Sequence, residues 1–222
     1  MNKECETSVN NTQNQEARYT LPLDFLYGAA ASGFQNELPD PFSPQSDWHE
    51  FILKNGIVYS NEVGPHWDNI ENAKRDLDTL RNLGLNSVRL GIEWARVMPE
   101  DAVNGQWKTD EAAVKYYREL VDYAEKLGLK PMLTLYHFAL PLWASRQGGW
   151  ESKRTTRAFT FFAERIAEAF NDVELWVTVN EPNTLIGMGY ITGYFPPEKK
   201  SIIAAITATK NLIQANDISF YL

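Results

Sequence analysis

The feature that most constrains the fold is a strand-length apolar run followed by a helical pattern, repeated four times along the chain. The apolar runs cover 25–32, 87–92, 132–136 and 174–179. The helical patterns, each with apolar residues on one face and the last one weaker, cover 69–82, 110–127, 153–170 and 199–215. Such alternation of strands and helices indicates a parallel sheet with helical crossovers.

Two architectures fit this alternation, a doubly wound open sheet and part of a (β/α)8 barrel. The segment after the first strand, GAAASGFQ (28–35), has neither a P-loop nor a dinucleotide-binding spacing. Polar residues instead follow the strand ends, where a barrel places its active site. They are Gln35, Glu93, His137, Asn180 and Glu181. We therefore predict an α/β fold of the (β/α)8 TIM-barrel type, an incomplete barrel with about the first four β/α units.

Charge and hydropathy exclude several classes of partner. The net charge of −8 argues against nucleic acid, which needs a clustered basic face. No apolar run approaches the roughly 20 residues that cross a bilayer, so we expect no membrane partner. Residues 1–20 lack the apolar centre of a signal peptide. We expect them to form a disordered polar tail, and we expect the protein to be cytoplasmic.

The segment TVNEPN (178–183) carries the sharpest chemical signal. Pro182 disfavours a helical conformation at Glu181, so we expect an extended backbone that points this glutamate into the barrel mouth. A carboxyl on an apolar, aromatic-lined rim would have a raised pKa, as a general acid requires. Asn180 can donate to and accept from a sugar hydroxyl. The motif alone leaves open that 180–183 is only a turn.

Five segments, in the same order, resemble glycoside hydrolase family one, the β-glucosidase and β-galactosidase family. They are FLYGAAASGFQNE (25–37), DWHEF (47–51), LGLNSVRLGIEWARVMP (83–99), PMLTLYHFALPLWASRQGGW (131–150) and WVTVNEPN (176–183). The resemblance covers about 21–216, which it identifies as the N-terminal half of a glycoside hydrolase barrel. The stretch GYITGYFPP (189–197) is similar to archaeal members.

The resemblance implies a role for individual residues. Glu181 matches the acid/base that protonates the leaving oxygen and later activates water. Asn180 matches the residue that contacts the sugar 2-hydroxyl. Gln35 and His137 match residues that bind other hydroxyls of the same ring. The alternative is that His137 is a buried core histidine that binds no ligand.

Two further residues gain roles from the resemblance. Arg89 matches the arginine that pairs with the nucleophilic carboxylate and helps to keep it ionised. Trp150 lies in the family's G-G-W motif, which implies a place near the substrate. Arg89 could instead be satisfied by Glu93 or another internal acid. We expect Glu93 and Arg96 to brace the structure.

The remaining tryptophans and the histidines suggest no further site. We expect the following tryptophans to pack rather than to stack on sugar: Trp48, Trp94, Trp143 and Trp176. The three histidines are scattered without metal-ligand spacing, so we expect neither a metal nor a cofactor.

A retaining mechanism needs a second carboxylate about 5–5.5 Å from the first. In the family this nucleophile is a glutamate in an E-N-G-type motif on the seventh strand, and the 222 residues contain no E-N-G sequence. We therefore expect a chain truncated before the nucleophile, with a divergent end over 217–222.

These observations predict a β-glycosidase polypeptide, a hydrolase of O-glycosyl bonds that acts on terminal β-linked sugars by retaining double displacement. Its substrate would be a β-glycoside or an oligosaccharide. We expect the isolated chain to be inactive and to need a complementary C-terminal half. Self-association through the open barrel edges is a second form of assembly. The alternatives are a non-catalytic sugar-binding half-barrel and an inactive remnant.

Overall fold

The computed structural model describes residues 22, 24–37, 45–55, 67 and 69–220. Four parallel strands form one sheet in chain order: β1 (Gly28–Ala31), β2 (Ser87–Gly91), β3 (Lys130–Tyr136) and β4 (Leu175–Val179). Across the sheet Ala30 pairs with Arg89 and Arg89 with Met132, while Tyr136 pairs with Val179. The predicted incomplete α/β barrel is confirmed, because this sheet has open edges at β1 and β4 within the described residues.

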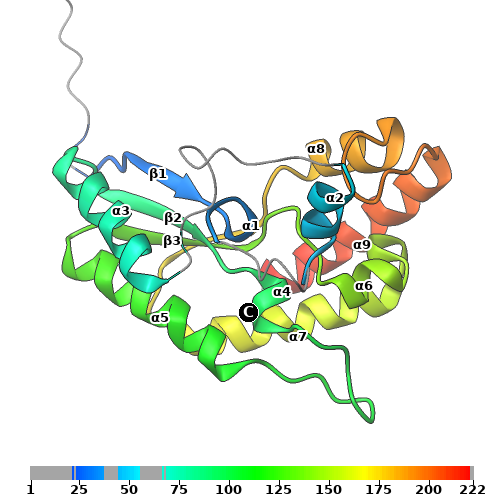
Figure 1. Ribbon diagram of the computed structural model, residues 1–222, viewed down its shortest axis with the longest axis horizontal. Coiled ribbons are helices and arrows are strands. Elements are labelled where there is room, and N and C mark those ends of the chain that lie inside the picture. The colour runs from blue at the N-terminus through cyan, green and yellow to red at the C-terminus, as the bar shows by residue number, and fades with distance from the viewer. Residues whose placement is uncertain (1–21, 23, 38–44, 56–66, 68, 221–222) are drawn as a thin grey trace, which may run out of the picture.

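Four longer helices connect or follow the strands: α3 (Ile70–Asn82), α5 (Glu111–Lys126), α7 (Lys153–Ala169) and α9 (Ile202–Phe220). Figure 1 shows α3, α5 and α7 along one side of the sheet. Asp110 caps α5 by accepting from the N–H groups of Ala112 and Ala113. The first three helices match the predicted ranges within a residue or two. The fourth continues to Phe220 with no break at the predicted boundary after Asn216.

The core fills the space between the sheet and these helices. Alternate residues of β2, Val88 and Leu90, are buried, while Arg89 between them is only partly buried. Aromatic rings dominate the centre, and the buried faces of α4 and α7 supply several of them. Among the largest are Trp94, Trp150, Tyr136, Phe159 and Phe162. Burial of such rings contributes much of the stability of a core.

Short helices stand where the strands end. They are α1 (Gly33–Asn36), α2 (Asp47–Lys54), α4 (Trp94–Val97), α6 (Leu142–Arg146) and α8 (Pro182–Ile186). A 3-10 turn covers Gly149–Glu151 and a π-helix covers Gly187–Thr192. Sequence periodicity did not predict them, because most span a single turn. The short helices after β1 and β4 place side chains at the carboxyl end of the sheet.

Some sequence expectations lie outside the described residues, among them the polar tail over 1–20. None of the helices in the described part of the chain combines the length and the apolar character that crossing a bilayer requires.

Candidate active site

Three side chains from neighbouring strands meet at the carboxyl end of the sheet. Arg89 of β2 donates from Nη1 to Oδ1 of Asn180 (2.8 Å) and to Oγ1 of Thr134 (3.2 Å). The backbone N–H of Asn180 extends the pairing of β4 with β3 by donating to the Tyr136 carbonyl (2.9 Å). The Asn180 side-chain nitrogen lies 3.3 Å from Nε2 of His137. The structure thus brings Arg89, His137 and Asn180 into one hydrogen-bonded cluster. The strand-end pattern predicted a place here for His137 and Asn180, whereas Arg89, inside β2, was named only by the resemblance.

The charge state of His137 follows from this cluster. Partial burial and the positive charge of Arg89 together lower its pKa to about 4, while Glu181 acts in the opposite direction. At neutral pH the imidazole is therefore uncharged. Its Nε2 can accept from the Asn180 amide, whose oxygen is already occupied by Arg89. An uncharged imidazole and an amide are groups suited to neutral hydroxyls.

We expect His137 to stay neutral from pH 8 to about pH 5 and to titrate near pH 4. Because its pKa in the folded chain lies below the ordinary 6.5, the unfolded chain takes up the proton first. The contribution of His137 to stability is therefore complete above pH 6.5 and is lost as the pH falls towards 4. Imidazole 15N shifts, assigned with His137→Gln, measure the midpoint. A midpoint at 6.5 or above would contradict this electrostatic account.

Glu181 differs from its predicted conformation. Its φ of 45° and ψ of 58° are left-handed, so the extended backbone expected from Pro182 is wrong. Proline disfavours the right-handed region at the preceding residue, and here β4 turns almost directly into α8, of which Pro182 is the first residue. The Glu181 carbonyl accepts from the N–H of Leu185 (3.1 Å). A left-handed glutamate costs roughly 1–3 kcal/mol, a strain often found at functional sites.

The surroundings of Glu181 also differ from expectation. The residue is exposed and is not enclosed by an apolar, aromatic-lined rim as the sequence predicted. It still acts electrostatically on His137 and therefore belongs to the same end of the sheet.

Gln35 reaches this end of the sheet from β1. It lies on α1, directly beyond the end of that strand, and is exposed. The hydroxyl of Ser32 donates to its Oε1 (2.6 Å). Gln35 thus has its own anchor and is not hydrogen-bonded to the cluster of Arg89, His137 and Asn180.

The predicted substrate contact of Trp150 is wrong. Its exposed fraction is 0%, and it packs against the rings of Trp94 (6.3 Å between centroids), Tyr136 (5.0 Å) and Phe159 (5.6 Å). Gly148 and Gly149, both with positive φ, turn the chain inward before it. Nearness to the site in the sequence therefore does not bring the indole to the surface.

The bracing residues behave as expected. The Glu93 carboxylate accepts from the backbone N–H groups of Phe34 (3.1 Å) and Ala95 (3.4 Å), so it does not satisfy Arg89. Arg96 pairs with Glu37 at 2.7 Å. Within the described part of the chain Arg89 makes no ion pair. Its bonds use Nη1 alone, and a guanidinium has further donors for a carboxylate ligand.

The other tryptophans have protein partners as well. Trp94 is buried in the core, Trp48 stacks on Phe34, and the indole N–H groups of Trp143 and Trp176 donate to backbone carbonyls. These contacts agree with the packing role expected of all four.

Sequence reasoning missed two buried carboxyls behind the site, Asp47 and Glu37. Burial raises the pKa of Asp47 to about 7, although its Oδ1 accepts from the Leu140 N–H at 2.9 Å. Burial likewise raises the pKa of Glu37, against the lowering effect of Arg96. Both residues lie in segments quoted for the resemblance, and an acid inside an apolar, aromatic run was the available signal. None of the described His, Cys, Asp and Glu side chains form a group of three placed to hold a metal ion.

Comparisons with known proteins give the same relatives by sequence and by structure. The family model described as Glycosyl hydrolase family 1 matches residues 17–220. A coniferin beta-glucosidase of Pinus contorta is 33% identical over 82% of this chain and 36% of its own length. A beta-galactosidase of Pyrococcus woesei is 29% identical over 90% of this chain and 49% of its own length.

Solved structures with the same arrangement include a beta-glycosidase from Pyrococcus horikoshii, at a TM-score of 0.80 and 32% identity. It matches 90% of this chain and 45% of that one. A beta-glucosidase from Thermotoga maritima in complex with castanospermine has a TM-score of 0.79 and 28% identity, over 90% of this chain and 46% of its own. The chain thus spans less than half the length of these relatives.

Proposed function

Because the chain belongs to glycosyl hydrolase family 1, we propose that it supplies the acid/base half of a site that hydrolyses terminal β-linked glycosides with retention. The observation that carries this proposal is the cluster of Arg89, Asn180 and neutral His137 beside the strained Glu181 at the carboxyl end of the sheet. Relatives named as beta-glucosidases and a beta-galactosidase support the sugar class.

In the proposed mechanism Glu181 transfers protons, and the other residues bind the sugar or the nucleophile. Glu181 gives its proton to the glycosidic oxygen in the first step and takes a proton from water in the second. Asn180 binds the 2-hydroxyl, where hydrogen bonds strengthen as the transition state forms. His137 and Gln35 bind other hydroxyls and orient the ring. Arg89 offers its remaining N–H donors to the nucleophilic carboxylate and favours its ionised form.

The second carboxylate is proposed to come from a complementary half-barrel. Retention requires a nucleophile about 5–5.5 Å from the acid/base, and the chain spans under half the length of its relatives. A second copy of this chain is a poorer source. If two copies closed into eight strands, the partner's β3 would take the seventh position and present its His137 there, with no carboxylate.

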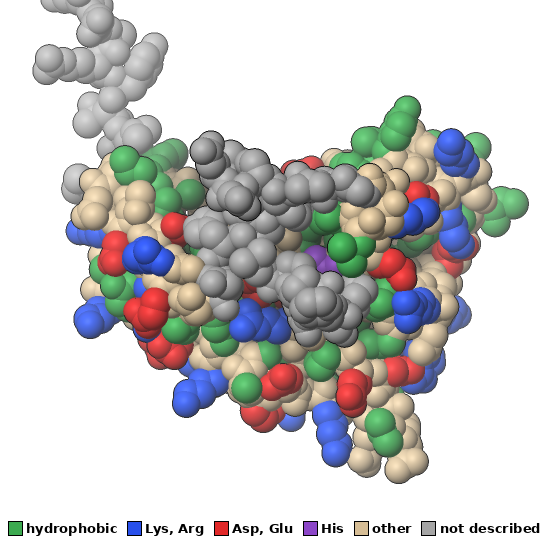
Figure 2. All heavy atoms as spheres, in the orientation of Figure 1, with side chains coloured by type: hydrophobic (Ala, Val, Ile, Leu, Met, Phe, Trp, Pro, Cys, Tyr) green, Lys and Arg blue, Asp and Glu red, His purple; other side chains and the backbone are tan. Residues whose placement is uncertain are grey.

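The β4 edge surface is formed by β4, α8, α9 and the π-helix between α8 and α9. Its features are those of a surface that another protein segment covers. Two hollows, of about 650 and 460 Å³, flank β4; Trp176 and Phe170 line the first, and Ile186 and Leu212 line the second. Ile191 and Ile213 stand more than half exposed beside them. Figure 2 shows apolar side chains on the surface over the α8 and α9 region, in the upper right. An unpaired strand edge with exposed apolar groups is a site for further pairing.

A completed barrel tests this proposal. It joins residues 17–216 to the part of the Pyrococcus horikoshii beta-glycosidase beyond the matched region, and the same join made with that enzyme's own N-terminal half serves as the positive control. We expect the completed barrel to hydrolyse 4-nitrophenyl β-glucoside and the 222-residue chain alone to show no turnover, because only the former has both carboxylates.

The outcome separates the candidate functions. A folded completed barrel with no turnover, next to an active positive control, would overturn the catalytic proposal. If that same barrel still bound glucose, the non-catalytic sugar-binding reading would replace it. The archaeal type and the cytoplasmic location inferred from sequence remain predictions.

A further inference from the structure

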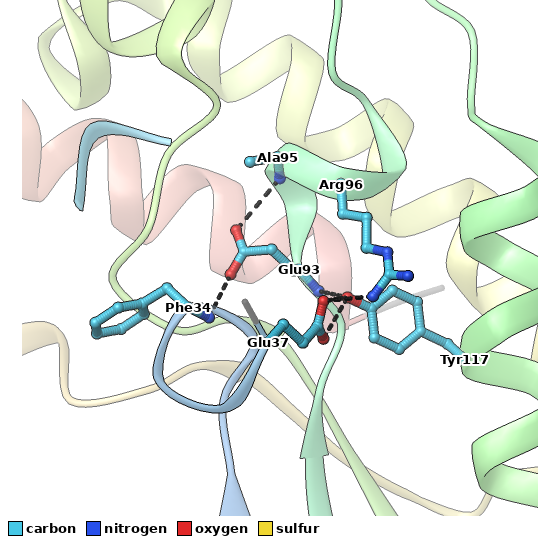
Figure 3. A network of polar contacts seen from close by, with 6 residues as sticks. All are labelled: Phe34, Glu37, Glu93, Ala95, Arg96 and Tyr117. Carbon is cyan, nitrogen blue, oxygen red and sulfur yellow. Dashed lines mark hydrogen bonds and ion pairs between the residues drawn. The ribbon is translucent and has the colours of Figure 1, made fainter. Parts of the chain in front are cut away.

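A buried carboxyl group, that of Glu93, holds the start of the short helix that carries Gln35. Figure 3 shows Glu93 between α1 and α4, with one oxygen 3.1 Å from the Phe34 nitrogen and the other 3.4 Å from the Ala95 nitrogen. Glu93 follows the end of β2 and is buried. The bond to Phe34 thus ties α1 to the segment that follows β2, while the bond to Ala95 caps α4.

The first N–H groups of helix α1 depend on partners outside the helix. It is four residues long, and Ser32, the residue before it, makes no side-chain capping bond. The N–H groups of Gln35 and Asn36 donate to the Ser32 carbonyl (3.3 and 3.1 Å), whereas those of Gly33 and Phe34, at the start of the helix, have no helical partner. The Glu93 carboxylate satisfies one of them from outside the helix, so the position of Gln35 depends on a residue 58 positions further along the chain.

The far end of α1 is held by the same network. Glu37, the residue after α1, accepts from Arg96 (2.7 Å) and from the hydroxyl of Tyr117 (2.7 Å). The Tyr117 hydroxyl in turn accepts from the backbone N–H of Glu93 (3.2 Å). Glu93, Arg96 of α4 and Tyr117 of α5 therefore hold α1 from both ends (Figure 3).

The fit between Glu93 and α1 leaves no spare room. A Cβ added at Gly33 would lie 2.5 Å from Cβ of Glu93 and 2.6 Å from its Oε2. Glycine is thus required at the first position of α1 for the carboxylate to approach the Phe34 N–H. A contact this close transmits a displacement of Glu93 directly to the helix.

We infer that Glu93 is a positioning residue, whose carboxylate fixes α1 so that Gln35 is held ready for a sugar hydroxyl. The part played by Gln35 in binding rests on the proposed function. The positioning of Gln35 by Glu93 is independent of that function and can be measured in the chain without any ligand.

The test is Glu93→Gln in the 222-residue chain, followed by 15N NMR. Glutamine keeps the size but has one acceptor for two N–H groups, so its NH2 faces a backbone donor. We expect hydrogen exchange at the Phe34 amide to rise about tenfold or more and the Gln35 side-chain amide to move towards its free-chain shift. The matched control is Asp47→Asn, since Asp47 is also a buried carboxyl that accepts a backbone N–H, that of Leu140. It should change the Leu140 amide and leave Phe34 and Gln35 as they were.

Unchanged Phe34 and Gln35 signals in Glu93→Gln, or equal changes in Asp47→Asn, would overturn the inference, because the effect would then be absent or a general loosening. Gly33→Ala is the second variant. Its added methyl group displaces α1 from Glu93 while the Glu93 side chain itself is retained. The Gln35 side-chain amide should therefore move towards its free-chain shift, as in Glu93→Gln.

Glucose affinity, measured in the completed barrel, then separates the two claims. With both correct, Glu93→Gln weakens binding about tenfold, and adding it to Gln35→Ala weakens binding no further than about twofold. If Gln35→Ala binds glucose normally while the NMR signature is present, the binding role of Gln35 fails and its positioning by Glu93 stands. If the losses of glucose affinity in Glu93→Gln and Gln35→Ala simply add in the double variant, Glu93 acts by another route and the inference is overturned.

Discussion

Replacing Glu181 by glutamine in the completed barrel should lower kcat for an alkyl β-glucoside by about 10²–10⁴-fold, the usual contribution of a general acid/base. The amide has no proton to give to the leaving oxygen and cannot take one from water. Binding should change much less, because the ring hydroxyls are bound by Asn180, His137 and Gln35. The loss therefore lies in kcat, and KM moves by only a few-fold.

The leaving group decides which step suffers. A 2,4-dinitrophenolate leaves without protonation, so the first step of the Glu181→Gln variant should be nearly normal with that substrate. The second step still lacks its base, and a burst of dinitrophenolate followed by slow turnover is expected. Azide should restore turnover in Glu181→Ala, since an anion that is already a nucleophile needs no general base.

Glu174→Gln is the control for this experiment. Glu174 lies just before the opposite end of β4 and forms an exposed ion pair with Lys130 at 2.6 Å. Such pairs contribute little to stability, and kcat should remain unchanged. Normal kcat in Glu181→Gln, or an equal loss in both variants, would remove Glu181 from the mechanism.

The largest effect on stability is expected for Trp150→Ala. Removing a fully buried indole that packs on three aromatic rings costs about 3–5 kcal/mol of unfolding free energy, a large part of what a domain of this size has. The carbonyl of Trp150 also accepts from Asn211 of α9 (2.8 Å), so the cavity lies where α9 is attached. Urea unfolding measures the loss.

Trp150→Phe is the matched comparison, because it keeps an aromatic ring in place and should lose considerably less. The folded fraction of either variant should bind glucose with normal affinity, since the indole does not reach the surface. Stable Trp150→Ala protein with weakened glucose binding would restore the substrate contact that the sequence motif suggested.

The contrast between Trp150 and His137 shows what the sequence could predict. Strand ends were readable from apolar runs, and parallel strands place their ends together, so His137 and Asn180 could be expected side by side. The long helices were readable because three or more turns establish a period, as in α5 and α7. Trp150 follows a strand by more than ten residues, and two glycines with positive φ redirect the chain in between. No local pattern reveals that turn.

Backbone detail at Glu181 was out of reach for a different reason. A following proline excludes the right-handed helical region but does not decide between the extended and left-handed ones. That decision depends on how β4 is joined to α8, which is a tertiary matter. Glu93 was expected to brace the structure. Which element it braces could only be seen once α1, a helix of one turn, had been placed beside it.

The central claim is that Glu181 and its neighbours form one half of a retaining site. The anomeric form of the first sugar released by the completed barrel from 4-nitrophenyl β-glucoside, followed by 1H NMR before mutarotation, tests it most directly. We expect β-glucose first, and no release with Glu181→Gln beyond a few per cent of the original rate. Release of α-glucose first, or β-glucose at an undiminished rate without Glu181, would contradict it.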